Sequence, residues 1–271
     1  MHRPYVSRRF CIAAVASLAG CCAIARASSP PPRQEQASPP LVAAASDLKF
    51  ALDDIIGEFR RDTGLDVRVT YGSSGDFARQ IRQGAPYELF LSADEQFVKI
   101  LADRGLTRDG GELYGLGRIV LFAPTGSPLV PDPRLEHLSR RLKDGSAGRL
   151  AIANPEHAPY GRAAEQALRS LGLWEAARAR LVLGENVAQA AQFASSGNAE
   201  GGIVAYSLAL SPELGRRGSY ALIPQALHAP LRQRMVLLAH ASPAAVRLYD
   251  YLRSPAGRAI LARYGFALPE D

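Results

Sequence analysis

The sequence predicts an α/β protein with two lobes and a ligand cleft between them. Predicted strands and helices alternate from Leu41 onward, and they fall into two βα sets over roughly 41–122 and 123–228. Such alternation is typical of a parallel sheet covered by helices. Open sheets of this kind bind ligands at the carboxyl ends of their strands, where the turns of both sets fall. A chain of 271 residues is long enough for one large or two medium domains.

The first set contains short apolar runs, each followed by a turn and an amphipathic helical pattern. Its expected strands are 41–42, 66–70, 88–92 and 118–123, and its expected helices are 50–60, 77–83 and 94–103. Pro124 closes the last of these strands, since proline cannot continue a ladder of hydrogen bonds. We expect 41–122 together with 229–271 to form the first lobe.

The second set follows a polar connection that contains proline. Its expected strands are 149–154, 181–183, 202–204 and 220–223, and its expected helices are 160–171 and 187–195. A C-terminal segment is left over, with an expected strand at 235–239 and expected helices at 243–253 and 255–263, and it is assigned to the first lobe. We expect 123–228 to form the second lobe.

The N-terminus is typical of an export signal. Arginines at positions 3, 8 and 9 precede a short apolar stretch, 10–19, which is too short to span a bilayer. Leu-Ala-Gly-Cys at 18–21 matches a lipoprotein box, which predicts a signal peptide of residues 1–20 and a lipidated Cys21. A plain cut after Ala27 is the alternative. The stretch 21–40, rich in proline and serine, predicts a linker, and the protein is expected in the periplasm, in the first case anchored to the membrane.

Composition excludes several classes of function. All three cysteines lie in the leader, at positions 11, 21 and 22, so the body holds no disulfide or cysteine metal site. Removing the leader takes away three arginines and no acids, which lowers the formal net charge from +6 to +3, too little to indicate a nucleic-acid partner. The five histidines have no metal-ligand spacing, and there is no Gly-x-Ser-x-Gly elbow or phosphate-binding glycine loop.

Two serine-bearing turns each follow a predicted strand and open a predicted helix. They are Ala-Ser-Asp-Leu at 45–48 and Gly-Ser-Ser-Gly-Asp at 72–76. A helix N-terminus leaves N–H groups unpaired and carries a partial positive charge, and a serine there adds a hydroxyl donor. Two such turns that face one point can hold a small dianion without a basic side chain. The alternative is that Ser46 and Ser74 are only helix N-caps.

With these turns and the blocks that follow them, the chain resembles the bacterial molybdate-binding proteins of oxyanion ABC importers, which have the type II periplasmic-binding-protein fold. The resemblance covers about 41–268. The matching segments are Ala-Ala-Ala-Ser at 43–46, Ser-Ser at 73–74, much of 78–94, Pro-Glu-His-Ala-Pro at 155–159, Glu-Asn-Val at 185–187, Gly-Ile-Val at 202–204 and Arg-Tyr-Gly-Phe at 263–266.

The resemblance implies a site in which both lobes donate hydrogen bonds to the anion. By position, Ser46 and Ser74 would give hydroxyl and N–H donors, Tyr160 a backbone N–H or its phenol, and Val187 a backbone N–H. The family's last ligand is often a tyrosine directly after the Gly-Ile-Val strand. Here Ala205 occupies that position and Tyr206 follows, so both are candidates for the fifth ligand.

The resemblance also implies a monomeric, non-enzymatic protein that needs no cofactor, binds molybdate and tungstate, and delivers them to an inner-membrane permease. Asp47 leaves an alternative open. It is either a first-turn acid favoured by the helix dipole or a proton acceptor for a ligand such as hydrogen phosphate. Binding of phosphate or sulfate therefore remains an alternative, as does a secreted α/β enzyme.

Overall fold

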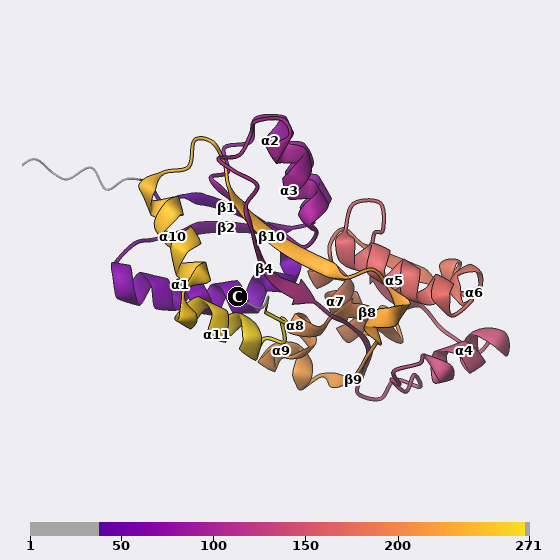
Figure 1. Cartoon of the computed structure of the whole chain (residues 1–271). Helices are drawn as coiled ribbons and strands as arrows, with labels where there is room; N and C mark the ends of the chain where they lie inside the picture. The colour runs from indigo at the N-terminus through magenta and orange to yellow at the C-terminus, as the bar shows by residue number, and fades with distance from the viewer. Residues whose placement is uncertain (1–37, 269–271) are drawn as a thin grey trace, which may run out of the picture. The chain divides into compact units, whose positions relative to one another are not determined.

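The computed structural model describes residues 38–268, which form two five-stranded sheets with helices packed on them (Figure 1). The expected leader, its cleavage sites, Cys21 and most of the linker lie outside the described residues. The strands are β1 (Leu41–Ala45), β2 (Arg68–Gly72), β3 (Leu89–Ser92), β4 (Glu112–Gly117), β5 (Ile119–Pro124), β6 (Leu150–Ala153), β7 (Leu181–Gly184), β8 (Gly201–Ala205), β9 (Gly218–Leu222) and β10 (Leu231–Leu237).

The helices that cover the two sheets follow in chain order. They are η1 (a 3-10 helix, Ser46–Leu48), α1 (Lys49–Thr63), α2 (Ser74–Arg82), α3 (Glu95–Ala102), α4 (Glu136–Lys143), α5 (Pro159–Ser170), α6 (Trp174–Arg178), α7 (Val187–Ser195), α8 (Tyr206–Ala209), α9 (Pro212–Gly215), η2 (a 3-10 helix, Gln225–Leu227), α10 (Pro243–Arg253) and α11 (Pro255–Arg263). None of the helices within 38–268 is long and apolar enough to cross a membrane.

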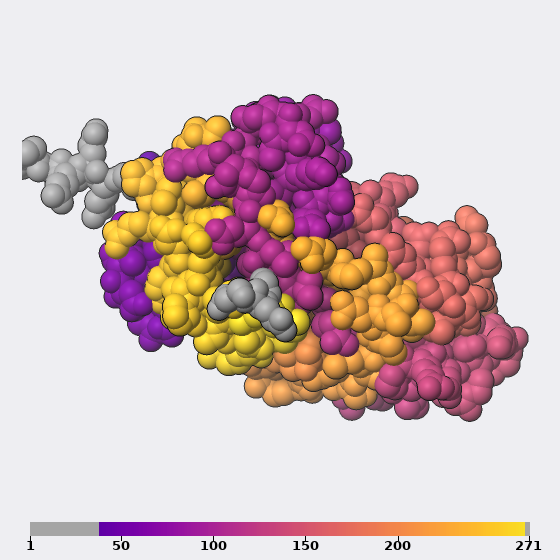
Figure 2. Space-filling view, viewed as in Figure 1, coloured from indigo at the N-terminus to yellow at the C-terminus, as the bar shows by residue number. Residues whose placement is uncertain are grey.

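The first sheet has the strand order β2-β1-β3-β10-β4 and is covered on both faces. Side chains alternate across a strand, so Val42 and Ala44 of β1 pack with α1, α10 and α11, whereas Ala43 packs with α2 and α3. Figure 1 shows these two groups of helices on opposite sides of the strands. In Figure 2 the yellow atoms of the C-terminal helices lie below the magenta atoms of the first half of the chain, and Leu116 of β4 forms a β-bridge with Ala267.

The second sheet has the order β7-β6-β8-β5-β9, and its core is rich in alanine. Small side chains allow helices to approach the strands closely. A Cβ on Gly161 of α5 would clash with the carbonyl oxygen of Ala153 at the end of β6, so glycine allows α5 to begin directly against the sheet. This close approach fixes the position of the neighbouring Tyr160.

The sheets are mixed, whereas the alternation of strands and helices predicted parallel ones. β1 runs parallel to β2 and β3, and β6 runs parallel to β7 and β8, as expected. β10 is antiparallel to β3 and β4, and β5 is antiparallel to β8 and β9. These antiparallel pairs involve the strands next to the two points where the chain passes between the sheets.

The passages between the sheets lie at 117–119 and 222–231. The expected strand 118–123 is present as β5, but it pairs with β8 and β9 of the second sheet and not with the first set of strands. The sequence does not reveal this pairing, because the apolar run at 118–123 follows the runs of the first set without any signal that the chain changes sheets. The sequence did not predict β4, α4, α6, α8 and α9, of which the last three are very short helices.

The core of the first sheet offers a test of the packing. Phe90 is fully buried on the α2–α3 face, so Phe90→Ala should lower the free energy of unfolding by about 3–5 kcal/mol through lost burial and the cavity left behind. Val130→Ala is the control, because this side chain is 58% exposed and its loss should change stability by less than about 0.5 kcal/mol. Chemical denaturation measures both; equal effects would contradict the packing.

Candidate functional site

A small pocket lies where the carboxyl ends of strands from both sheets meet the N-termini of the following helices. Its cavity volume is about 10 Å³, about the room of one water molecule. It is lined by Ala45, Ser46, Asp47, Gly72, Ser73, Ser74, Ala93, Ala158, Pro159, Tyr160, Asn186 and Val187. Four of the expected ligands, Ser46, Ser74, Tyr160 and Val187, therefore come together from segments far apart in the sequence. None of these lining residues carries a positive charge.

The hydroxyl groups of Ser46 and Ser74 both accept a hydrogen bond from the backbone. Ser46 Oγ accepts from the N–H of Ala188 at 3.2 Å, and Ser74 Oγ accepts from the N–H of Ala93 at 2.9 Å. Within residues 38–268 neither hydroxyl donates to a protein acceptor. Because a hydroxyl carries one proton and two lone pairs, each serine keeps its proton for a further acceptor.

Neither serine is a helix N-cap. Ser73 caps α2, since its hydroxyl accepts from the N–H of Asp76 at 3.3 Å, and Ser74 is the first residue of the helix. Ser46 opens η1, whose N-cap position is Ala45 and carries no side-chain cap. The interpretation of these serines as caps is therefore wrong, and their burial needs another explanation.

Three α-helices add backbone donors at the pocket. Ser74 and Val187 are the first residues of α2 and α7, and Tyr160 is the second residue of α5, after a proline that has no N–H. N–H groups at these positions have no acceptor within their own helix. The side chain of Asn186 accepts from the N–H groups of Ala188 and Gln189, which leaves that of Val187 at the helix end. The arrangement suits an anion, because helix N-termini carry a partial positive charge.

The phenol of Tyr160 has a different partner from the one expected. It donates to Oδ2 of Asp47 at 3.0 Å, so its proton is not directed at a ligand. Gln233 donates from Nε2 to the same carboxylate oxygen at 2.8 Å and to the Tyr160 hydroxyl at 2.9 Å, and Tyr114 donates to Oε1 of Gln233 at 2.6 Å. All four side chains are buried, and they join both sheets in one hydrogen-bonded network.

Sequence reasoning missed Gln233 and Tyr114. The one available signal was Gln233 itself, a polar residue at an inward position of an otherwise alternating strand, between Leu231 and Met235. Gly117 leaves the space for the network, because a Cβ there would clash with the Tyr160 hydroxyl and the Gln233 amide.

Asp47 lies in the first turn of η1, but its carboxylate is buried and accepts from Tyr160 and Gln233. It is 1% exposed, and burial raises the pKa of its carboxyl group to about 6, although the hydrogen bonds from Gln233 and Tyr160 oppose this shift. Both donors bind Oδ2, and Oδ1 is buried with no hydrogen-bond partner among the described residues.

Ala205 and Tyr206, the candidates for a fifth ligand, do not line the pocket. Ala205 ends β8 and pairs with Ile119, and the N–H of Tyr206 donates to the carbonyl oxygen of Arg118 at 2.9 Å. The Tyr206 ring packs against Tyr220, with 5.7 Å between ring centroids. The next residue, Ser207, donates instead to the backbone oxygen of Asp47 at 2.8 Å.

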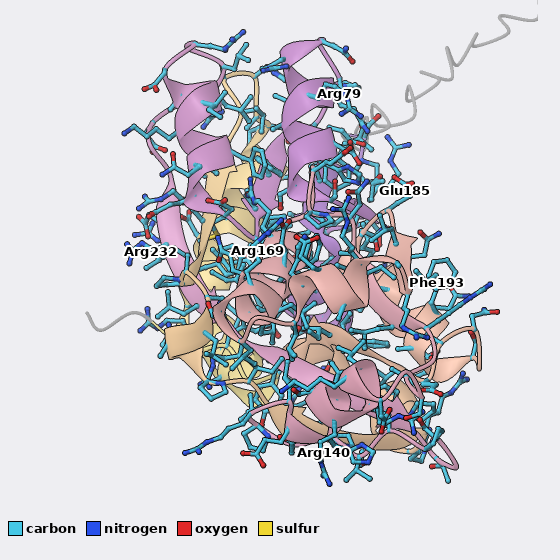
Figure 3. All side chains as sticks on the ribbon, turned by 90° about the vertical axis from the view of Figure 1, so that its right-hand side faces the viewer. Arg79, Arg140, Arg169, Glu185, Phe193 and Arg232 are labelled. Atoms are coloured by element: carbon cyan, nitrogen blue, oxygen red, sulfur yellow. The ribbon has the colours of Figure 1, made fainter. Side chains whose placement is uncertain are left out.

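Beside the pocket, α2 contacts the segments that precede α5 and α7. The N–H of Gly75 donates to the carbonyl oxygen of His157 at 3.1 Å, and His157 Nε2 lies 3.0 Å from the backbone oxygen of Glu185. Figure 3 shows Arg79 of α2 and Glu185 on the same side of the molecule. These contacts make His157 a hydrogen-bonded residue of the turn that precedes α5.

Asp76, His157 and Glu185 bring possible metal-ligand atoms within 4.8 Å of one another. These groups already have partners, however. Oδ1 of Asp76 accepts from Arg79 at 2.6 Å and Oδ2 from Ser73 at 2.9 Å, while His157 bonds the backbone at residue 185. The arrangement therefore favours a hydrogen-bonded contact over a metal site.

Comparison with known proteins finds a family of solute-binding proteins. The model of the bacterial extracellular solute-binding protein family matches residues 40–267. The molybdate-binding protein ModA of Azotobacter vinelandii is 38% identical over 229 residues, which cover 83% of this chain and 88% of that protein. The ModA protein of Rhodobacter capsulatus is 37% identical over 227 residues, covering 83% and 86%.

The solved structure of the A. vinelandii periplasmic molybdate-binding protein superposes with a TM-score of 0.76 at 30% identity. The match covers 85% of this chain and 100% of that one. The similarity therefore extends over nearly all the described residues.

The raised pKa of Asp47 predicts a pH-dependent stability. Since the folded protein holds this proton up to about pH 6 and the unfolded chain releases it near 3.8, the folded state binds more protons between these values. Stability contributed by Asp47 therefore falls as pH rises through this interval, by at most about 3 kcal/mol. The Asp47→Asn variant should gain stability relative to the natural protein over the same interval and keep a constant difference above it.

Chemical denaturation at several pH values in a buffer without oxyanions measures this difference. If the difference in stability between Asp47→Asn and the natural protein were the same at pH 3.8 and at about pH 6, this result would contradict the raised pKa of Asp47.

Proposed function

Because the chain belongs to the bacterial extracellular solute-binding proteins, we propose that it captures molybdate, and tungstate with it, for delivery to the permease of an ABC importer. It is a binding protein rather than an enzyme, in agreement with the relatives, which are named for binding. The observation that carries the choice of ligand is the pocket that offers donors from both sheets and no cationic side chain.

The donors proposed for the anion are the hydroxyl groups of Ser46 and Ser74 and the helix N-terminal N–H groups of Ser74, Tyr160 and Val187. Each hydrogen bond to a charged group contributes about 1.5–3 kcal/mol, so five would contribute roughly 8–15 kcal/mol before the cost of association. Such a sum is compatible with a dissociation constant between micromolar and nanomolar. Ala205 and Tyr206 are not part of this proposal.

Molybdate and tungstate suit these donors because they carry no proton near neutral pH. Hydrogen phosphate brings a proton for which Oδ1 of Asp47 is an available acceptor, so phosphate remains the alternative ligand that the titration below tests. Sulfate carries the same charge as molybdate but is smaller, so a pocket of fixed radius would discriminate against it by size.

The two sheets would act as two lobes that close on the ligand. The chain passes between them at 117–119 and 222–231, which are the candidate hinges. Contacts such as Ser46 with Ala188 and Gly75 with His157 join elements of both sheets around the pocket. A ligand that touches both lobes stabilises the closed form, and a permease can recognise that form.

We further propose that the protein acts as a monomer in the periplasm. Residues 1–20 would direct export, and Cys21 would carry a lipid anchor. The support is the lipoprotein box at 18–21 and the proline-rich stretch that follows it. Cleavage after Ala27, without an anchor, is the alternative.

Calorimetric titration of the purified protein with molybdate, tungstate, sulfate and phosphate at neutral pH tests the choice of ligand. Molybdate and tungstate should bind tightly, while sulfate and phosphate should release no measurable heat. Tighter binding of phosphate or sulfate would show that this anion, and not molybdate, is the cargo. Absence of binding to all four anions would overturn oxyanion capture.

Serine substitutions test the proposed donors. Ser46→Ala and Ser74→Ala should each weaken molybdate binding by about 1–3 kcal/mol without unfolding the protein, because each removes a hydroxyl donor. The matched control is Ser242→Ala, whose hydroxyl caps α10 away from the pocket by accepting from the N–H of Ala245. Losing this cap should cost about 1 kcal/mol of stability and leave the affinity unchanged. Unchanged affinity in both Ser46→Ala and Ser74→Ala would refute the assignment.

A further inference from the structure

We propose that Asp47 takes up one proton from solvent when a fully ionised oxyanion enters the pocket, so that capture is coupled to protonation of a buried carboxylate. This inference rests on the proposed function and adds a regulation of the same site. It starts from the geometry of Asp47, which follows Ser46 in the chain and lines the pocket together with both serines.

The two oxygens of the Asp47 carboxylate have different surroundings. Oδ2 accepts from Tyr160 at 3.0 Å and from Gln233 at 2.8 Å, and Oδ1 has no partner among the described residues. A buried carboxylate oxygen without a donor is a costly arrangement. Protonation of Oδ1 removes the charge and converts the oxygen into a donor, and an oxyanion in the same pocket supplies the acceptor that this donor needs.

No cation balances Asp47 among the groups with which the structure brings it into contact. Tyr160 faces it from α5 and Gln233 from β10, and Tyr114 of β4 lies behind Gln233. Ser207 of α8 bonds its backbone oxygen. Burial raises the pKa values of Tyr160 and Tyr114 well above their ordinary value, so both phenols remain neutral. Asp47 is therefore the group among these that can change charge near neutral pH.

The balance of charge makes the direction of the coupling clear. A dianion beside an ionised Asp47 places three negative charges in a buried site, and one proton from solvent reduces them to two. Burial, opposed by the hydrogen bonds from Gln233 and Tyr160, already brings the pKa of Asp47 to about 6, and a nearby dianion raises it further. At a pH slightly above 7 the carboxyl group is thus ionised in the empty protein and protonated in the complex.

Titration calorimetry in buffers with different ionisation enthalpies measures the protons taken up. Molybdate is titrated into the purified protein at about pH 7.5 in HEPES, Tris and imidazole, all free of phosphate. The observed enthalpy should vary linearly with the ionisation enthalpy of the buffer, with a slope that approaches one proton per anion. In addition, the affinity should fall by about tenfold per pH unit as the pH rises above neutrality.

Two variants assign the proton. Asp47→Asn keeps an acceptor for Tyr160 and Gln233 but cannot ionise, so molybdate binding should no longer change the number of bound protons or depend on pH. Ser74→Ala is the matched control, because it removes a proposed ligand donor and leaves Asp47 intact. Its affinity should fall while its proton uptake stays the same. The measurement on the natural protein tests the proposal even when a variant fails to fold.

The outcomes separate this inference from the proposed function. Molybdate binding without proton uptake overturns the coupling and leaves the function in place, as does proton uptake that persists in Asp47→Asn. Absence of binding to molybdate and tungstate overturns the proposed function itself, and the coupling with it. Proton uptake that vanishes only in Asp47→Asn supports the coupling.

Discussion

The site depends on unpaired backbone N–H groups at the N-termini of helices that begin where buried strands end. These groups have no acceptor within their helices, and three helices, α2, α5 and α7, direct such ends at the same pocket. The sheets hold these ends in place, since β1 and β6 are buried on both faces and Gly161 brings α5 against the sheet. A small anion can accept hydrogen bonds at once from donors beside both sheets, and such an anion would stabilise the arrangement in which the two sheets are close together.

The two serines strengthen this arrangement through the direction of their hydrogen bonds. Ser46 and Ser74 each accept a backbone N–H, so their protons remain for an acceptor in the pocket. Ser73, between β2 and Ser74, uses its hydroxyl for capping and for Asp76. Neighbouring serines in one turn thus have different roles, and the distinction comes from partners that are distant in the sequence.

The predictable part of the site is the part encoded locally. Strand, serine and helix follow one another within a few residues at Ser46 and Ser74, so the turns and their meeting at one edge could be inferred from the chain. In the family that the chain resembles, a tyrosine directly follows the Gly-Ile-Val strand, whereas here Ala205 stands in that place and Tyr206 comes one position later. The sequence could not show whether Tyr206 still reaches the pocket, because only the pairing of Ala205 with Ile119 shows which way the next side chain points. The contact of Tyr114 with Gln233 joins residues 119 positions apart, and no local pattern encodes it. The sequence likewise did not show to which sheet β5 belongs, because the pairing of β5 with β8 and β9 also joins residues far apart in the chain.

Asp47 gives the pocket a property that donors alone cannot provide. Hydroxyl and N–H donors stabilise any small anion and respond little to whether that anion carries a proton. A carboxylate responds strongly, since two unit charges about 4 Å apart interact with about 4 kcal/mol at an effective dielectric constant of 20. A ligand that brings its own proton can give it to Asp47, whereas a bare dianion must draw one from solvent. Under the proposed coupling, rising pH therefore disfavours the bare dianion relative to a protonated one. Selectivity between tetrahedral oxyanions would then depend on the proton balance of this one buried carboxyl group as well as on the radius of the pocket.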